Sequence, residues 1–233
     1  MLLQKSVLAL DSDNIYLHYK NNKNIKQMGT NCIEKIAIIG VNKQDRIVLS
    51  QALSYLTGYK IIRQTAYPIQ AIKYGLNNEL LKCSRQELFL YALASFTERI
   101  EMEQKCSQYV SNGNVFTELA EMEAISDSSV CSKREKKEQK FMIEGMKKII
   151  TEYAVREYDC IIHNSINQHD NSALSVSIDN ILAELSKGCK NVYRITGESI
   201  VADILEKIIV NPKISPKSAL ERAKQEIIKI ISL

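Results

Sequence analysis

The sequence predicts an α/β protein built on a doubly wound, parallel, five-stranded sheet. Two observations support this prediction. Short apolar runs with the length of buried strands alternate with longer segments of helical periodicity, and several of those segments end at a glycine. Helices placed between short apolar strands are typical of parallel sheets. The predicted strands are Ile36–Ile39, Tyr59–Arg63, Tyr109–Ser111, Asp159–His163 and Asn191–Ile195.

The run Ile36–Ile39 is predicted to be the central strand because all of its residues are apolar. It ends at Gly40, and a helix is predicted to follow. Asp45 is expected to be the N-cap of this helix and Gly58 its C-cap. The apolar positions that recur at helical spacing are Val48, Leu49, Ala52, Leu53 and Leu56.

The order of a strand, a glycine, a five-residue turn and a helix is the layout of a phosphate-binding P-loop, G-x-x-x-x-G-K-[ST]. In the frame that starts at Gly40, the second glycine is replaced by Asp45, the lysine by Arg46 and the Ser/Thr by Ile47. If the loop binds a nucleotide, the candidate ligands are Gly40, Asn42, Lys43, Asp45, Arg46 and Ile47.

Each replacement works against phosphate binding. Asp45 adds a Cβ where glycine lets the chain wrap closely, and it adds negative charge where phosphate would lie. Arg46 keeps the positive charge but not the compact ammonium, and Ile47 cannot ligate Mg²⁺. Two interpretations therefore remain open, an ordinary strand–helix turn and an altered nucleotide site.

The remainder of the chain supplies helices and loops. Ser84 and Glu87 form a capping box that starts a long helix, with Arg99 at the edge of its apolar face. A last helix, Ser218–Ile231, carries an apolar stripe that docks on the body or on another subunit. The predicted division is an N-terminal extension with a hairpin (1–33), an α/β domain (34–210), and a C-terminal linker and helix (211–233).

Ligands of parallel sheets bind beyond the carboxyl ends of the strands, here called the carboxyl edge. Four loops are expected to meet at that edge, namely Gly40–Ile47, Gln64–Tyr67, Asn112–Asn114 and Asn164–Asp170.

Composition excludes several classes of function. A net charge of +4 is too small to predict nucleic-acid binding, and no apolar run is long enough for a membrane span. The six cysteines are scattered, without a C-x-x-C pair, which argues against a zinc site and indicates a reducing, cytoplasmic location.

From about Glu34 to Val210 the chain resembles the P-loop kinase-like ATPase domain related to nicotinamide riboside kinases. The resemblance rests on the Gly40 loop, on the stretch ELFLYALASFTERIEMEQKCSQYVSNGNVFTELAEMEA, and on YDCIIHNS and VYRITGES. It implies a P-loop NTPase-like fold with an acidic residue at the corner after the third strand and arginines in a lid. Here the corner is Asn112, a further candidate nucleotide-binding residue that carries no charge, and the lid segment 167–177 has no Arg or Lys.

The resulting hypothesis is a degenerate P-loop kinase-like protein without efficient phosphoryl transfer, acting by binding a nucleotide or a protein partner. No catalytic residue and no metal ligand is assigned, and ATP with Mg²⁺ is the candidate cofactor. One alternative is a nucleotide-dependent, nucleoside-type small-molecule kinase that uses Lys43 and Arg46 as phosphate ligands. Another is a purely structural subunit or homo-oligomer.

The cysteine pattern generates the first prediction. Denatured, unreduced protein should show all six thiols of Cys32, Cys83, Cys106, Cys131, Cys160 and Cys189 in a thiol-reagent titration. A count below six would contradict the assignment of a reducing compartment.

Overall fold

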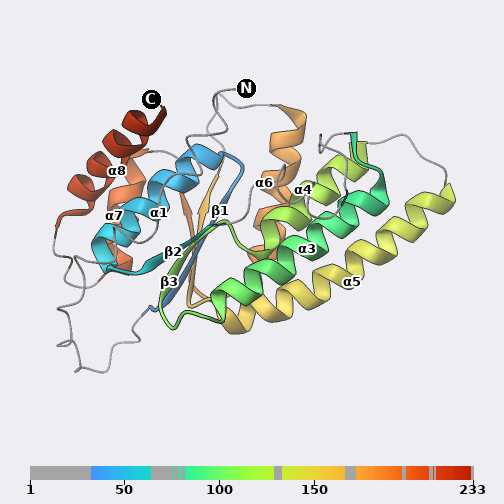
Figure 1. Ribbon diagram of the computed structural model, residues 1–233, viewed down its shortest axis with the longest axis horizontal. Helices are drawn as coiled ribbons and strands as arrows, with labels where there is room; N and C mark the ends of the chain where they lie inside the picture. The colour runs from blue at the N-terminus through green and yellow to red at the C-terminus, as the bar shows by residue number, and fades with distance from the viewer. Residues whose placement is uncertain are drawn as a thin grey trace.

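The computed structural model describes residues 33–63, 75, 79, 82–128, 133–165, 172–195, 198–209, 212 and 214–231. Five parallel strands form one sheet in the order β2-β3-β1-β4-β5 (Figure 1). The predicted fold class and the central place of the first strand are both confirmed. The strands are β1 (Lys35–Gly40), β2 (Lys60–Arg63), β3 (Tyr109–Asn112), β4 (Cys160–Asn164) and β5 (Val192–Ile195).

Helices cover both faces of the sheet, so the molecule has three layers (Figure 1). One outer layer consists of α1 (Lys43–Thr57), α7 (Glu198–Ile208) and α8 (Pro216–Ile231). The other consists of α3 (Arg85–Glu103), α4 (Val115–Ser128), α5 (Lys133–Glu157) and α6 (Ala173–Ser186).

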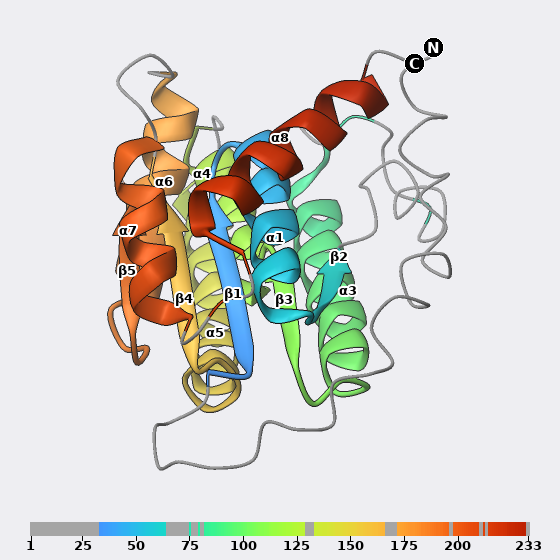
Figure 2. The ribbon, with the colours of Figure 1, turned by 90° about the vertical axis from the view of Figure 1, so that its left-hand side faces the viewer.

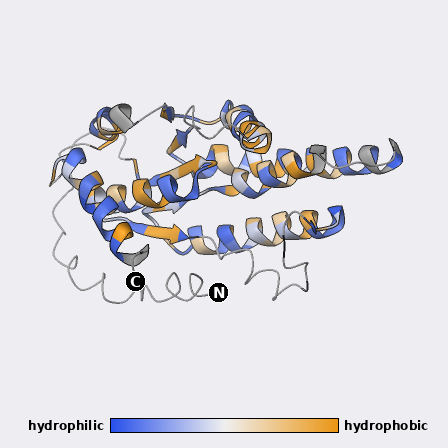
Figure 3. Cartoon of the chain, turned by 90° about the horizontal axis from the view of Figure 1, so that it is seen from above, coloured by the Kyte–Doolittle hydropathy of each residue, from blue (hydrophilic) through white to orange (hydrophobic). Residues whose placement is uncertain are grey.

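The alternation of side chains along β1 divides the core into two clusters. Ala37 and Ile39 face α3–α6, whereas Ile36 and Ile38 face α1, α7 and α8. All four side chains are fully buried, as a central parallel strand requires. Figure 3 shows hydrophobic residues on the strands and on the helices that cover them.

A buried polar network crosses the α3 side of the core. Arg99 of α3 donates to Ser111 Oγ of β3 at 3.0 Å and pairs with Glu118 of α4 at 3.2 Å. Ser111 in turn donates to Glu103, which also accepts from Tyr158. The prediction that Arg99 lies at the edge of its helix face is wrong, because its side chain is 0% exposed. The two carboxylates allow this burial by compensating the guanidinium charge.

The C-terminal helix docks on the body, as one of the two predicted alternatives stated. α8 lies across α1 (Figure 2), where Ala219, Ala223 and Ile227 are buried. Tyr55 of α1 donates to Glu226 of α8, and Arg222 stacks 4.5 Å over the Tyr55 ring. The helix begins at Pro216 rather than Ser218. Proline suits the first helical position because the N–H groups of the first turn have no partner within the helix, so its missing N–H costs no hydrogen bond.

Several sequence predictions lie partly outside the described residues. Four cysteines within them, Cys83, Cys106, Cys160 and Cys189, are free thiols. Cys32, Cys131 and the N-terminal hairpin fall outside, so they and the three-part domain division stay predictions. No described helix is both long and apolar enough to cross a membrane.

The network makes a testable prediction about stability. Replacing Arg99→Met leaves Glu118 and Glu103 buried without their cation, so the free energy of unfolding should fall by about 3–5 kcal/mol. Urea denaturation measures it. The control is Arg134→Met, which removes an exposed i,i+4 pair with Glu138 and should change stability little. Equal effects of the two changes would show that the buried pair is not structurally important.

Candidate functional site

The ends of β1, β3 and β4 meet at the carboxyl edge, where the chain changes direction within the sheet. From β1 the chain builds β2 and β3 on one side and then crosses to β4 on the other. Register places Asn112 beside Ile38, and Asn164 beside Gly40. Such a switch point is where open α/β sheets bind ligands. The structure therefore brings Gly40 and Asn112 to one place, as predicted.

Gly40 is needed for close packing of the backbone. Its φ is +148°, a value that L-residues rarely adopt, and a Cβ here would lie 2.2 Å from the Asn164 carbonyl oxygen. The glycine thus lets β4 end directly against β1, a role that does not require a phosphate.

The predicted five-residue turn after Gly40 is wrong. Only Val41 and Asn42 separate β1 from α1, which begins at Lys43. Asn42, and not Asp45, is the N-cap: its Oδ1 accepts from Gln44 N at 2.9 Å and Asp45 N at 3.2 Å. The second glycine of a P-loop is absent, and Lys43, Gln44 and Asp45 instead form the first turn of α1. The C-cap at Gly58 is confirmed.

Arg46 turns back onto the strand end instead of outward. Its Nη1 donates to Gly40 O and, at 3.4 Å, to Val41 O, and the residue is 7% exposed. Burial lowers the pKa of Arg46, although nearby Glu121 and Glu118 oppose this shift. The guanidinium at the P-loop lysine position is therefore engaged by the protein's own carbonyls. The other candidates stay near the surface, with Lys43 exposed and Asp45 and Ile47 half-buried.

The corner after β3 is tightly folded. Gly113, at φ +82°, donates to Ile38 O at 2.8 Å, and Asn114 Oδ1 accepts from Phe116 N at 2.9 Å at the start of α4. Asn112 is half-buried, whereas Asn114 is fully buried. Sequence reasoning selected Asn112 and missed the structural role of Asn114. An Asn directly before an apolar helix is a capping signal that could have identified it.

Two carboxylates that the sequence analysis did not select face this corner. Glu118 of α4 pairs with Arg99, and Glu121 lies one turn further on, near the phenol of Tyr91 at 3.5 Å. Burial and then the charge of Glu118 raise the pKa of Glu121 from 4.5 to about 7, against the opposing charge of Arg46. Their i,i+3 spacing puts both on one face of α4, which was readable from the sequence.

Buried polar atoms without partners concentrate here. Among the described residues six such side-chain atoms occur, and four belong to this region: Arg46 Nε, Arg99 Nε, Asn114 Nδ2 and Glu118 Oε2. Buried polar groups are usually hydrogen-bonded, so each of these atoms calls for an explanation such as strain, a bound water or a functional role. Within the described chain no cluster of three or more His, Cys, Asp or Glu side chains is arranged to hold a metal ion.

A second polar cluster fixes the ends of β4 and β5. Asp179 of α6 bonds His163 Nε2 at 2.8 Å, Ser165 Oγ at 2.8 Å and Arg194 Nη2 at 3.0 Å. Although burial opposes ionisation, these bonds and the Arg194 charge lower the pKa of Asp179. The carboxylate thus anchors α6 to both strands. His163 and Ser165 both bond Asp179 rather than each other, so no serine–histidine pair forms.

The other predicted loops cannot be placed. Gln64–Tyr67 and most of Asn164–Asp170 lie outside the described residues, apart from Asn164 and Ser165. Asn164 reaches Asp45, with its Nδ2 donating to Asp45 Oδ2 at 3.4 Å.

No family model and no curated protein matches the sequence. Solved structures of deoxyadenosine kinase from M. mycoides are similar: the one with bound dCTP shares 14% identity at a TM-score of 0.47, covering 84% of this chain and 99% of that chain. The one with bound dATP shares 15% identity at a TM-score of 0.41, covering 84% of each. The relation to nicotinamide riboside kinases stays a prediction.

The raised pKa of Glu121 predicts how stability depends on pH. The folded protein binds this proton more tightly than the unfolded chain does, so stability should fall as pH rises from 4.5 through about 7. Glu121→Gln should reduce that fall by about 2 kcal/mol, allowing for the group's partial exposure. Chemical denaturation across this pH range tests it, with Glu144→Gln on α5 as control. An unchanged slope in Glu121→Gln would contradict the assignment.

Proposed function

We propose that this protein is a P-loop kinase-like protein that binds a nucleotide or a protein partner at the carboxyl edge and does not transfer phosphoryl groups efficiently. The observation that carries the proposal is the start of α1 at Lys43, directly after the Asn42 cap. A phosphate-binding loop needs free backbone N–H groups at this point.

Three features argue against tight polyphosphate binding and against phosphoryl transfer at the Gly40 loop. The N–H groups of Gln44 and Asp45 are already bonded to Asn42, and the Arg46 guanidinium is bonded to Gly40 and Val41. Glu118 lies near Arg46, and Glu121, whose pKa is raised to about 7, adds further negative charge as the pH rises above neutrality; this charge opposes a bound polyphosphate. Asn112 offers no carboxylate at the corner where a base or Mg²⁺ ligand is expected.

The alternative is a nucleotide-dependent small-molecule kinase with an altered loop. Lys43 favours it, because this exposed ammonium lies in the first turn of α1, where the helix dipole also attracts anions. Under this alternative Lys43 would carry the role of the missing P-loop lysine, and Arg46 would turn outward to the phosphates.

Calorimetry with MgATP separates the two functions. The wild type should bind MgATP weakly or not at all. The variant Asn42→Gly/Asp45→Gly/Arg46→Lys/Ile47→Thr removes the cap and restores the glycine, lysine and hydroxyl positions, so it should gain measurable affinity. With nucleosides added, neither protein should raise the rate of ADP formation from ATP above the rate in buffer alone, because Asn112 and a lid without arginine or lysine remain.

The matched control is Arg46→Lys/Ile47→Thr, which keeps the Asn42 cap. It should gain no affinity, because the N–H groups of Gln44 and Asp45 stay occupied. Circular dichroism verifies that each variant is folded. Tight Mg²⁺-dependent binding by the wild type, together with nucleoside-dependent ADP release, would overturn the proposal and establish the kinase.

A further inference from the structure

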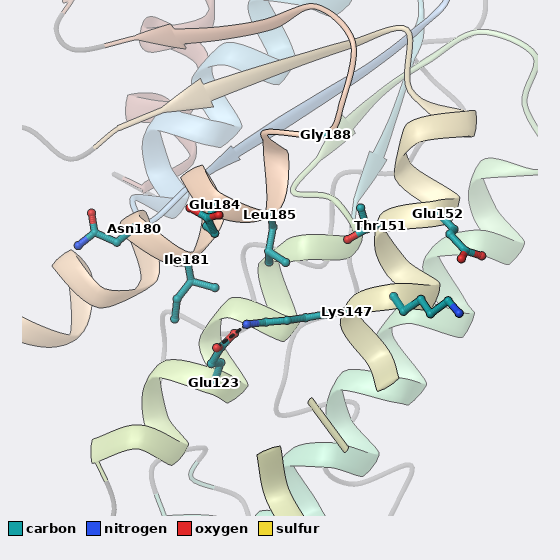
Figure 4. A pocket seen from close by; sticks show the side chains of 10 residues that line it. Glu123, Lys147, Thr151, Glu152, Asn180, Ile181, Glu184, Leu185 and Gly188 are labelled. Carbon is teal, nitrogen blue, oxygen red and sulfur yellow. Dashed lines mark hydrogen bonds and ion pairs between the residues drawn. The ribbon is translucent and has the colours of Figure 1, made fainter. Parts of the chain in front are cut away.

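A cavity of about 620 Å³ lies away from the carboxyl edge, between α4, α5 and α6. Figure 4 shows Glu123 of α4 and Lys147 of α5 pointing toward one another, with Ile181 and Leu185 of α6 beside them. Thr151 lines the α5 side. The volume is within the range of small-molecule sites, and the wall combines an apolar surface with one ion pair.

The ion pair leaves half of its carboxylate unsatisfied. Lys147 Nζ lies 2.6 Å from Glu123 Oε1, whereas Glu123 Oε2 is buried without a hydrogen-bond partner. A buried acceptor without a donor is costly. The Glu123 side chain is 17% exposed and that of Lys147 is 34% exposed, so the lysine is the more accessible member of the pair.

We propose that this cavity is a second binding site, which takes a small primary amine with an apolar body. The ligand's ammonium replaces that of Lys147 on Glu123 and satisfies both carboxylate oxygens, while the flexible lysine chain swings into solvent. The apolar body then covers Ile181, Leu185 and the Thr151 methyl group, which supplies hydrophobic free energy that the lysine does not.

The unpaired carboxylate oxygen favours a cation over an anion at this site. The lining carries the carboxylates of Glu123, Glu152 and Glu184 and the ammonium groups of Lys147 and Lys148, and Glu184 is already paired with Lys187. The unpaired atom is an acceptor, so a ligand that donates hydrogen bonds satisfies it, and a carboxylate or phosphate does not.

Isothermal calorimetry on the full chain tests the site with three probes of one shape: hexylamine, hexanol and hexanoate. Hexylamine should bind the wild type, and Glu123→Gln should abolish this binding. Glu184→Gln removes a rim carboxylate that is already paired with Lys187, so it should leave the affinity within about twofold.

Lys147→Ala tests the exchange itself. Without the internal ammonium, Glu123 is left unpaired, so hexylamine should bind this variant roughly tenfold or more tightly than wild type and raise its melting temperature more. Equal affinities for hexylamine and hexanol would show that only the apolar chain is recognised and would overturn the proposal. Tighter hexanoate than hexylamine binding, unchanged affinity in Glu123→Gln, or no hexylamine binding by the wild type would also overturn it.

Discussion

The buried ion pair between Arg99 and Glu118 is the interaction on which the α3–β3–α4 side of the protein depends. Three elements contribute to it, because Arg99 also bonds Ser111 of β3. A buried ion pair adds little net stability, since desolvation offsets much of the attraction, but it tolerates only one geometry. Its effect is to fix how α4 leaves the β3 corner. Gly113 is part of this fit, because a Cβ there would lie 3.2 Å from Arg99 Nη2.

The same rigidity extends to the candidate site. On one side the corner is held by Arg99 and Glu118, and on the other the strand end is held by Arg46 and the Asn42 cap. The connection between β1 and α1 is not a glycine-rich loop that could wrap around a ligand. Under the proposed function, recognition at this edge would depend on side chains of fixed helices, Glu121 among them, more than on backbone N–H groups.

The fold was predictable from the sequence because its signals are local and repeated. The apolar run at Ile36–Ile39, the capping box at Ser84 and the glycine at Gly58 each specify one element, and the structure confirms them. Two predictions at the site were wrong for a shared reason. The length of the Gly40 turn and the cap at Asp45 were inferred from an aligned motif, whereas the chain follows the nearest capping residue, Asn42.

The burial of Arg99 and the role of Glu118 could not be predicted in the same way. They are separated in sequence by a strand, and a charged residue within a helical apolar stripe usually lies at its edge. Only the packing of α3 against α4 shows that the charges of Arg99 and Glu118 compensate each other. Glu121 is an intermediate case, since its spacing from Glu118 was visible but its partners, Arg46 on α1 and Tyr91 on α3, were not.

The packing of α8 on α1 has a consequence for how the chain folds during synthesis. Leu49, Leu53 and Leu56 of α1 belong to the core cluster that Ala219 and Ala223 of α8 complete. Tyr55 and Glu226, which join the two helices, are 171 residues apart. Ribosomes add roughly 5–20 residues per second, so α8 is synthesised on the order of ten seconds or more after α1. During this interval the α1 side chains that contact α8 lack that contact, so we expect the nascent chain to be more prone to hydrophobic association. Slow codons late in the message would lengthen this interval, whereas the α3–α6 layer could already be packed.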